Sequence, residues 1–132
     1  MLVRTSSVAA LAMMAGAFVL SVSAPAQAQP GCAPLPAPAG HVVDVAPSQV
    51  TRLQSILDAA RPGDTVQLLD GEYLLPQTLV LRRPGVTLRS KSGDRGAVVL
   101  DGRYVARDLV LIQRSDITIA DLTVARSYWH LV

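Results

Sequence analysis

The pattern of apolar positions predicts one amphipathic helix near the middle of the chain. Its apolar residues fall on one face at the 3.6-residue helical period: Val50, Leu53, Ile56, Leu57 and Ala60. We expect the helix to span residues 50–61, with Ser48 as its N-cap, because a serine hydroxyl can accept a hydrogen bond from a free backbone N–H. Pro62 and Gly63 should end it, since the residue before a proline disfavours helix and glycine permits a reversal.

Short strands, and no second helix, are predicted after this point. A strand is expected at residues 65–69, and another at residues 41–45 before the helix. Further segments rich in Val, Ile, Leu and Thr are separated by Gly, Pro, Asp, Arg and Ser, and they cover residues 78–81, 86–88, 97–100, 109–112, 117–119, 122–124 and 130–132. The chain is therefore predicted to be mostly β-structure.

The spacing of apolar residues in these strands indicates a repeat of about 20 residues. Two parallel series recur every 19 residues, namely Leu79, Val98, Ile117 and Leu81, Leu100, Ile119, and a third runs through Val66, Val86, Leu109 and Leu131. A leucine-rich repeat would need an asparagine or cysteine ladder, and the chain contains no asparagine. A propeller blade would need a repeat of about 40 residues. A parallel β-helix fits best, with each series forming a column of inward side chains.

Two local features support the β-helix interpretation. Ile117 and Ile119 alternate, but Leu122 and Val124 resume after an odd step, so Ala120-Asp121 should be a bend that turns the chain to a new wall. The first coil of a solenoid exposes an apolar end, and such ends need a cap. We therefore expect the apolar stripe of the helix to cover that end.

The N-terminus predicts export. Residues 1–28 read as a signal peptide, with Arg4 before an apolar run and Ala26-Gln27-Ala28 as a small-x-small cleavage motif. The alternative, an uncleaved membrane anchor, needs a longer apolar run. Residues 29–40 should be a proline-rich linker, and residues 41–132 the folded part. The mature protein is expected in the periplasm or outside the cell, with no membrane association after cleavage.

The net charge and the cysteine content bear on three properties: nucleic-acid binding, disulfide formation and lipidation. Without residues 1–28 the chain has 11 basic and 10 acidic side chains, a balance that argues against nucleic acid as a partner. Cys32 is the only cysteine, so no internal disulfide can form. A lipidation site at Cys32 requires an apolar residue three positions earlier, and Gln29 occupies that position. We therefore interpret Cys32 as an incidental free thiol.

The residues from Leu53 to Tyr73, with Ala-Ala-Arg-Pro-Gly-Asp-Thr-Val at the centre, resemble the start of secreted right-handed parallel β-helix proteins. The chain is most similar to the pectate-lyase-like superfamily, on the chondroitinase B and alginate lyase side, and residues 115–124 resemble a typical coil of that family. The resemblance covers roughly residues 42–132. It implies an acidic polysaccharide ligand and, in the longer lyases, catalytic basic residues and calcium on coils downstream of the cap. No position here matches those motifs, so no catalytic residue and no cofactor is assigned.

Tyr128, Trp129 and His130 form the densest cluster with functional potential. An aromatic side chain on a β-helix flank can stack on a sugar ring, and the histidine can act as acid or base. They are our candidate substrate-binding residues, and the alternative is ordinary packing at the start of the next coil.

Several charged residues could bind a substrate or calcium, but the sequence favours ordinary surface and turn positions for them. Lys91, the only lysine, lies in a polar loop and is expected to be a solvated turn residue. Asp101, Asp116 and Asp121 could bind calcium if they converged, but turn positions explain them. Arg82-Arg83 could grip an acidic polysaccharide, but a solvated strand end is favoured.

Three functional hypotheses stay open. The first is the N-terminal part of a secreted enzyme that acts on or binds acidic polysaccharide, with the catalytic coils outside this chain. The second is a non-catalytic β-helix for carbohydrate binding or cell-surface adhesion, and the third is a truncated product without activity. Because the last coil has no visible cap, the chain is expected to be a fragment that self-associates through its uncapped end.

Overall fold

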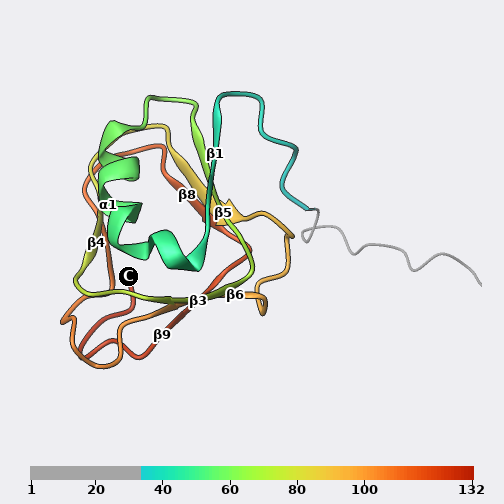
Figure 1. Cartoon of the computed structure of the whole chain (residues 1–132). Helices are drawn as coiled ribbons and strands as arrows, with labels where there is room; N and C mark the ends of the chain where they lie inside the picture. Colours follow the sequence, from blue (N-terminus) through green and yellow to red (C-terminus); the bar gives the residue numbers. More distant parts are fainter. Residues whose placement is uncertain (1–33) are drawn as a thin grey trace, which may run out of the picture. The chain divides into compact units, whose positions relative to one another are not determined.

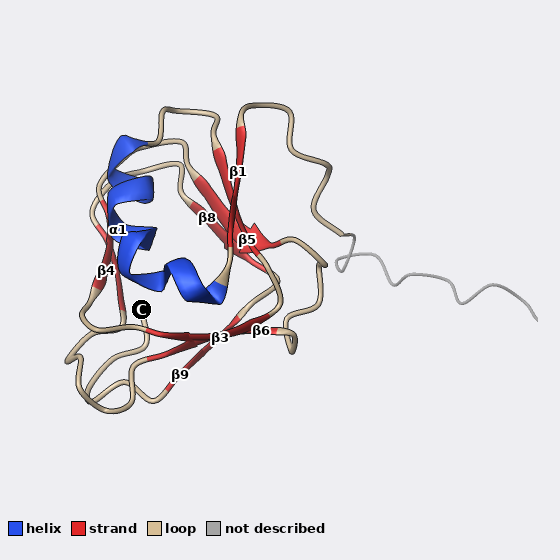
Figure 2. Cartoon of the chain, viewed as in Figure 1, coloured by secondary structure: helices blue, strands red, loops and turns tan. Residues whose placement is uncertain are grey.

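The computed structural model describes residues 34–132, so the predicted signal peptide and Cys32 lie outside the described residues. The described part is mostly strands in parallel sheets with one short α-helix (Figures 1 and 2). The elements in chain order are β1 (Val42–Val45), the 3₁₀ helix η1 (Pro47–Gln49), α1 (Val50–Ala59), β2 (Thr65–Leu68), β3 (Gly71–Leu74), β4 (Leu79–Leu81), β5 (Thr87–Ser90), β6 (Val98–Asp101), β7 (Val110–Ile112), β8 (Thr118–Ala120) and β9 (Thr123–Ala125).

The strands form three sheets that the chain visits in rotation. The sheet orders are β1-β2-β5-β8, β3-β6-β9 and β4-β7, and every strand pair described is parallel. From β2 onward the chain passes to β3, then β4, and returns to the first sheet at β5. The expected bend at Ala120-Asp121 is confirmed, because Asp121 has a φ of 56° between β8 in the first sheet and β9 in the second.

The predicted 19-residue columns are wrong. Leu100 pairs with Tyr73 and Val124, Leu81 pairs with Ile112, and Ile119 pairs with Leu88. The other two predicted series fail in the same way, because Leu79 pairs with Val110 and Val66 pairs with Leu88.

Loops of unequal length hide the true interval between stacked residues. It is 22 residues from Val66 to Leu88. It grows to 31 from Leu88 to Ile119, because the loops at residues 91–97 and 102–109 both intervene. The 19-residue spacing had instead connected residues that lie in different sheets.

The core lies between the three sheets and under the helix. It is built from the inward residues of the strands together with Leu53 and Leu57, the two buried residues of α1. Figures 1 and 2 show α1 within the outline that the three sheets trace, between β1 and β4. Burying each leucine contributes roughly 1.5–3 kcal/mol. The apolar stripe of the helix therefore packs against the sheets through these two residues.

The helix also pairs with a strand edge through one polar side chain. Gln54 donates from Nε2 to the carbonyl oxygen of Val80 at 2.9 Å and accepts from the Val80 N–H at 2.9 Å. The neighbouring residues Leu79 and Leu81 direct their backbone bonds to the β7 side. A side-chain amide thus occupies the backbone groups that another strand would otherwise use.

The ends of α1 differ from the prediction. Pro47 opens a 3₁₀ turn that contains Ser48, so Ser48 is not the N-cap, and no side-chain hydrogen bond caps α1. The Ala46 N–H instead donates to the Gln49 side chain at 3.0 Å. The helix ends at Ala59, two residues before the predicted end, because Ala60 already adopts an extended conformation ahead of Arg61-Pro62.

Two strand assignments also change. Gly71–Leu74 is a strand, β3, which its sequence did not reveal because only Tyr73 is buried in it. The predicted strand at residues 130–132 is not formed, and only an isolated bridge joins His130 to Asp108.

The Tyr73 side chain connects the ends of β1 and β2. It is fully buried, and its hydroxyl lies 2.6 Å from the carbonyl oxygen of Val45 and 2.8 Å from that of Leu69. Burial raises the pKa of Tyr73 to about 12. The hydroxyl therefore stays a donor shared between the ends of β1 and β2.

Candidate functional site

The candidate site is built on two stacked loops, residues 102–108 after β6 and residues 126–130 after β9. Backbone N–H groups of the second loop donate to the first, from Tyr128 to Ala106 and from Trp129 to Arg107, at 3.0 and 2.9 Å. The Ser127 hydroxyl also donates to the carbonyl oxygen of Arg107, at 2.9 Å. The loops therefore continue the parallel stacking of the strands before them.

A buried ion pair anchors the start of both loops. Asp101, at the end of β6, is fully buried and accepts hydrogen bonds from Arg126 Nε and the Arg103 N–H, both at 2.8 Å. Arg126 also donates from Nη2 to Asp101 and, at 2.8 Å, to Glu72. The Arg126 guanidinium lowers the pKa of Asp101 to about 2, and Asp101 raises the pKa of Arg126.

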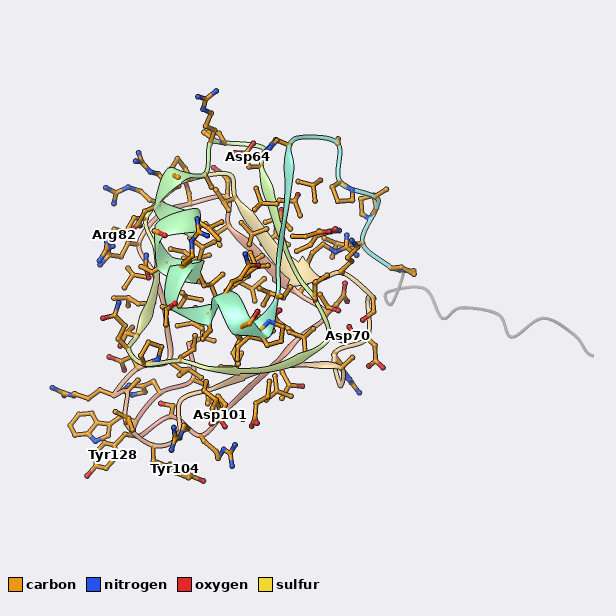
Figure 3. The ribbon with its side chains drawn as sticks, in the orientation of Figure 1. Asp64, Asp70, Arg82, Asp101, Tyr104 and Tyr128 are labelled. Carbon is orange, nitrogen blue, oxygen red and sulfur yellow. The ribbon has the colours of Figure 1, made fainter. Side chains whose placement is uncertain are left out.

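This anchor places three aromatic side chains on the surface. Tyr104, Tyr128 and Trp129 have exposed fractions of 64%, 65% and 61%. Figure 3 shows Tyr104 and Tyr128 pointing away from the body of the protein, on the side of Asp101. Large aromatic residues lose apolar stabilisation when they remain in water, so a cluster of them marks a contact surface.

Arg107 lies against Trp129. Its Cζ atom is 4.4 Å from the centre of the Trp129 ring, a cation–π distance. The Tyr128 and Trp129 rings are near parallel, at 19°, with centroids 6.4 Å apart. The contact fixes a positive charge beside an aromatic face, the combination that binds a sugar ring carrying a carboxylate.

His130 has an orienting partner, Asp108. The His130 Nδ1 atom is 2.8 Å from Asp108 Oδ1, and both side chains are largely exposed. A carboxylate on one ring nitrogen fixes the orientation of the imidazole and leaves the other nitrogen for a ligand. The imidazole of His130 can donate a proton to a bound hydroxyl group or accept a proton from it. We name Tyr104, Arg107, Asp108, Tyr128, Trp129 and His130 the aromatic platform.

The sequence found half of the aromatic platform. Tyr128, Trp129 and His130 are adjacent in the chain and lie together, as adjacency requires. Tyr104, Arg107 and Asp108 come from the loop after β6, and sequence reasoning missed them. The backbone bridge between Asp108 and His130 spans 22 positions, which the incorrect 19-residue period could not align.

The other candidate residues lie elsewhere and have protein partners. Lys91 forms an ion pair with Asp44 and is half exposed. Asp101 pairs with Arg126 and Asp121 with Arg89, while Asp116 has the φ of 60° of a turn residue. Within residues 34–132, no three His, Cys, Asp or Glu side chains are grouped as a metal site would require.

The paired arginines bind the helix. Arg82 contacts Asp58 at 3.4 Å, and Arg83 donates from Nε to the carbonyl oxygen of Asp58 at 2.8 Å. The expectation of a purely solvated strand end is thus incomplete, since both side chains stabilise the carboxyl-terminal turn of α1.

Comparison with protein-family models, with curated proteins and with solved structures found no match. None of the helices in residues 34–132 is long and apolar enough to cross a membrane. The functional argument therefore rests on the aromatic platform itself: stacked rings, one fixed cation and one oriented imidazole on neighbouring loops.

Proposed function

We propose that residues 41–132 form the N-terminal cap and first coils of a right-handed parallel β-helix in an exported protein. Parallel pairing throughout and the rotation of the chain through three sheets support this architecture. The packing of α1 against the sheets supports its role as a cap. The proposal keeps the resemblance to the pectate-lyase-like superfamily as its source for export and for polysaccharide as the ligand class.

We propose further that the aromatic platform binds an acidic polysaccharide. The observation that carries this is Arg107 held at 4.4 Å over the Trp129 ring, beside the oriented His130. A sugar ring would stack on the exposed aromatic surface while its carboxylate meets the guanidinium. The alternative, a non-catalytic adhesion module, uses the same contacts and differs only in the absence of turnover.

Fluorescence titration tests binding directly, because Trp129 is the only tryptophan in the chain. Acidic oligosaccharides from alginate, pectate and chondroitin should change its emission in a saturable manner, and neutral oligosaccharides of equal length should bind several-fold more weakly. Arg107→Gln should remove the preference for the acidic ligand. Arg52→Gln, a matched exposed arginine on α1, should not. Equal responses to acidic and neutral ligands would contradict the proposal.

The same ligands separate binding from cleavage. Release of unsaturated uronate, followed by ultraviolet absorbance, should be undetectable with this chain, because its only lysine is paired with Asp44 and is not available as a general base. Turnover that disappears in His130→Ala would instead assign proton transfer to the His130–Asp108 pair. Either result leaves the fluorescence titration to decide on binding.

A further inference from the structure

One corner of the protein is built from a repeated turn. Strands β2, β5 and β8 each begin with a threonine, and these three threonines are register partners. Figure 1 shows the turns that lead into these strands nested at one corner, in green, yellow and orange. An arginine stands four residues before each threonine, in the sequences Arg61-Pro-Gly-Asp-Thr65, Arg83-Pro-Gly-Val-Thr87 and Arg114-Ser-Asp-Ile-Thr118.

The three turns stack in the same register as the strands. The Gly63 N–H donates to the carbonyl oxygen of Gly85 at 2.8 Å, and the Gly85 N–H donates to that of Ser115 at 3.4 Å. Adjacent strands are about 4.8 Å apart, so the backbones at the three arginines follow one another at about this spacing. The arginines recur at unequal intervals of 22 and 31 residues, which become visible only when the register is known. We name Arg61, Arg83 and Arg114 the arginine ladder.

The arginine ladder is exposed and has no acidic partner within residues 34–132, where none of its side chains forms an ion pair. Arg83 donates to the carbonyl oxygen of Asp58, and Arg114 donates to that of Gln113, both at 2.8 Å. The carboxylate of Asp58 contacts Arg82 instead. Like charges on adjacent strands of a stack repel one another, and an anion placed between them removes that repulsion.

Two aspartates of the same turns limit the width of this basic surface. Asp64 accepts a hydrogen bond from the Arg61 N–H at 2.8 Å, so its carboxylate is directed back into its own turn. Asp116 lies two residues after Arg114, at a φ of 60°. The positive surface is therefore a narrow row that runs across three turns. A linear chain fits such a row, whereas a flat lipid surface requires a broad basic face.

The geometry of the anion follows from the stacking. The two oxygens of a carboxylate lie in one plane, and a single guanidinium engages both of them. The oxygens of a phosphate group are arranged tetrahedrally, so one group can accept hydrogen bonds from the arginines on both sides of it. The turns contain no aromatic residue on which a nucleic-acid base could stack. These features favour a phosphate chain without bases.

We propose that the arginine ladder binds a linear inorganic phosphate polymer. The polymer lies across the three turns, and its phosphate groups sit between neighbouring arginines. The arginine ladder and the aromatic platform share no residue, and this proposal does not rest on the function proposed for the platform.

Isothermal titration calorimetry of the mature chain tests the proposal with orthophosphate, tripolyphosphate and long-chain polyphosphate. At equal phosphate concentration the affinity should rise in that order, because a longer chain engages more arginines. Added salt should weaken the binding, since each arginine that meets a phosphate releases a counterion. Equal affinity for all three probes would contradict binding along a row.

Arg114→Gln is the cleanest variant, because the described contact of this side chain is to the carbonyl oxygen of the preceding residue. It should weaken polyphosphate binding several-fold and lower the slope of log affinity against log salt concentration by about one. Arg114→Lys keeps the charge but loses the planar fork, so the affinity should fall while the salt slope stays. Arg95→Gln, at an exposed arginine in the loop between β5 and β6, should change neither quantity.

Other anions separate the alternatives. Single-stranded oligothymidylate, acidic oligosaccharides and phosphatidylglycerol vesicles should each bind more weakly than polyphosphate, with no dependence on Arg114. The proposal is overturned if one of them binds more tightly than polyphosphate and loses that binding in Arg114→Gln. It is also overturned if the double variant Arg61→Gln/Arg114→Gln, shown to be folded by its thermal melt, binds polyphosphate as well as the parent chain does.

Discussion

Asp101 and Arg126 form an asymmetric ion pair: the carboxylate is fully buried, while the guanidinium remains 49% exposed and also contacts Glu72. The two partners therefore depend on each other unequally. Arg126 can turn to Glu72 and to water, but the oxygens of Asp101 are shielded from solvent. The cost of losing each partner should differ accordingly.

Arg126→Gln should destabilise the protein far more than Asp101→Asn. The first variant removes the guanidinium that compensates the charge of the Asp101 carboxylate. The second leaves a neutral amide that can still accept from the Arg103 N–H. Chemical denaturation of both variants measures the difference, with Glu72→Gln as an exposed control that should change little. Equal losses from both would contradict the asymmetry.

The same pair predicts a stability loss in acid. The pKa of Asp101 is about 2 in the folded protein, below its ordinary value of 3.8, so the folded state binds this proton less readily than the unfolded state. The stabilisation is complete above about pH 4 and is lost as the pH falls from there toward 2. Denaturation midpoints across this range should fall more steeply for the parent chain than for Asp101→Asn; parallel curves would refute the assignment.

Tyr73→Phe should destabilise the protein by about 1–2 kcal/mol, because the carbonyl oxygens of Val45 and Leu69 lose their shared donor in a buried site. The ring itself remains packed, so the fold should persist with an unchanged denaturant slope. Thermal and urea unfolding measure the loss. A Tyr104→Phe variant, whose side chain is largely exposed, provides the matched control and should melt like the parent chain.

Leu100→Asp should cost several kcal/mol, on the order of 3–5, because an unpaired charge would be buried between Tyr73 and Val124. Leu111→Asp, on a side chain that is 40% exposed in β7, is the control for adding the same charge to a strand. Thermal melts of both variants should separate clearly, and similar midpoints would show that Leu100 does not lie in the core.

We also predict that the mature chain associates with a second copy of itself. Within residues 34–132, β7, β8 and β9 are each the last strand of their sheet, and the apolar side chains of Ile112, in β7, and Leu131 are 43% and 46% exposed. Such edges pair readily with another chain, and lysine discourages this. Light scattering after size exclusion should show Ile112→Lys shifted toward monomer relative to the parent chain. Val105→Lys, at a loop residue that is 71% exposed, should not shift it.

Local patterns predicted α1 and most of the strands, because these elements depend on neighbouring residues, but they missed β3 and wrongly added a strand at residues 130–132. The stripe of α1 identified Leu53 and Leu57 as buried, and the odd step before Leu122 located the bend at Asp121. The register between coils could not be obtained in this way. Stacked residues lie 22 to 31 positions apart, and the loops that change this interval carry no period of their own.

In the candidate site, too, residues adjacent in the chain could be predicted, and residues brought together by stacking could not. Tyr128, Trp129 and His130 could be recognised because they are adjacent, whereas Arg107 and Asp108 reach them only through the stacking of two loops. The contact between residues 35–40 and Arg89 could not be found from sequence at all. It depends on residues 35–40 lying across a strand that begins some fifty positions later, and no pattern in a proline-rich segment encodes that contact.

The pairing of Gln54 with Val80 determines at which edge the β4-β7 sheet can accept another strand. The side-chain amide already occupies the N–H and C=O groups of Val80 that face the helix, so a further strand can join the β4-β7 sheet only beyond β7. In each sheet the strand already in place then serves as the template for the next one, and ordering should spread from α1 in the order in which a ribosome delivers the strands.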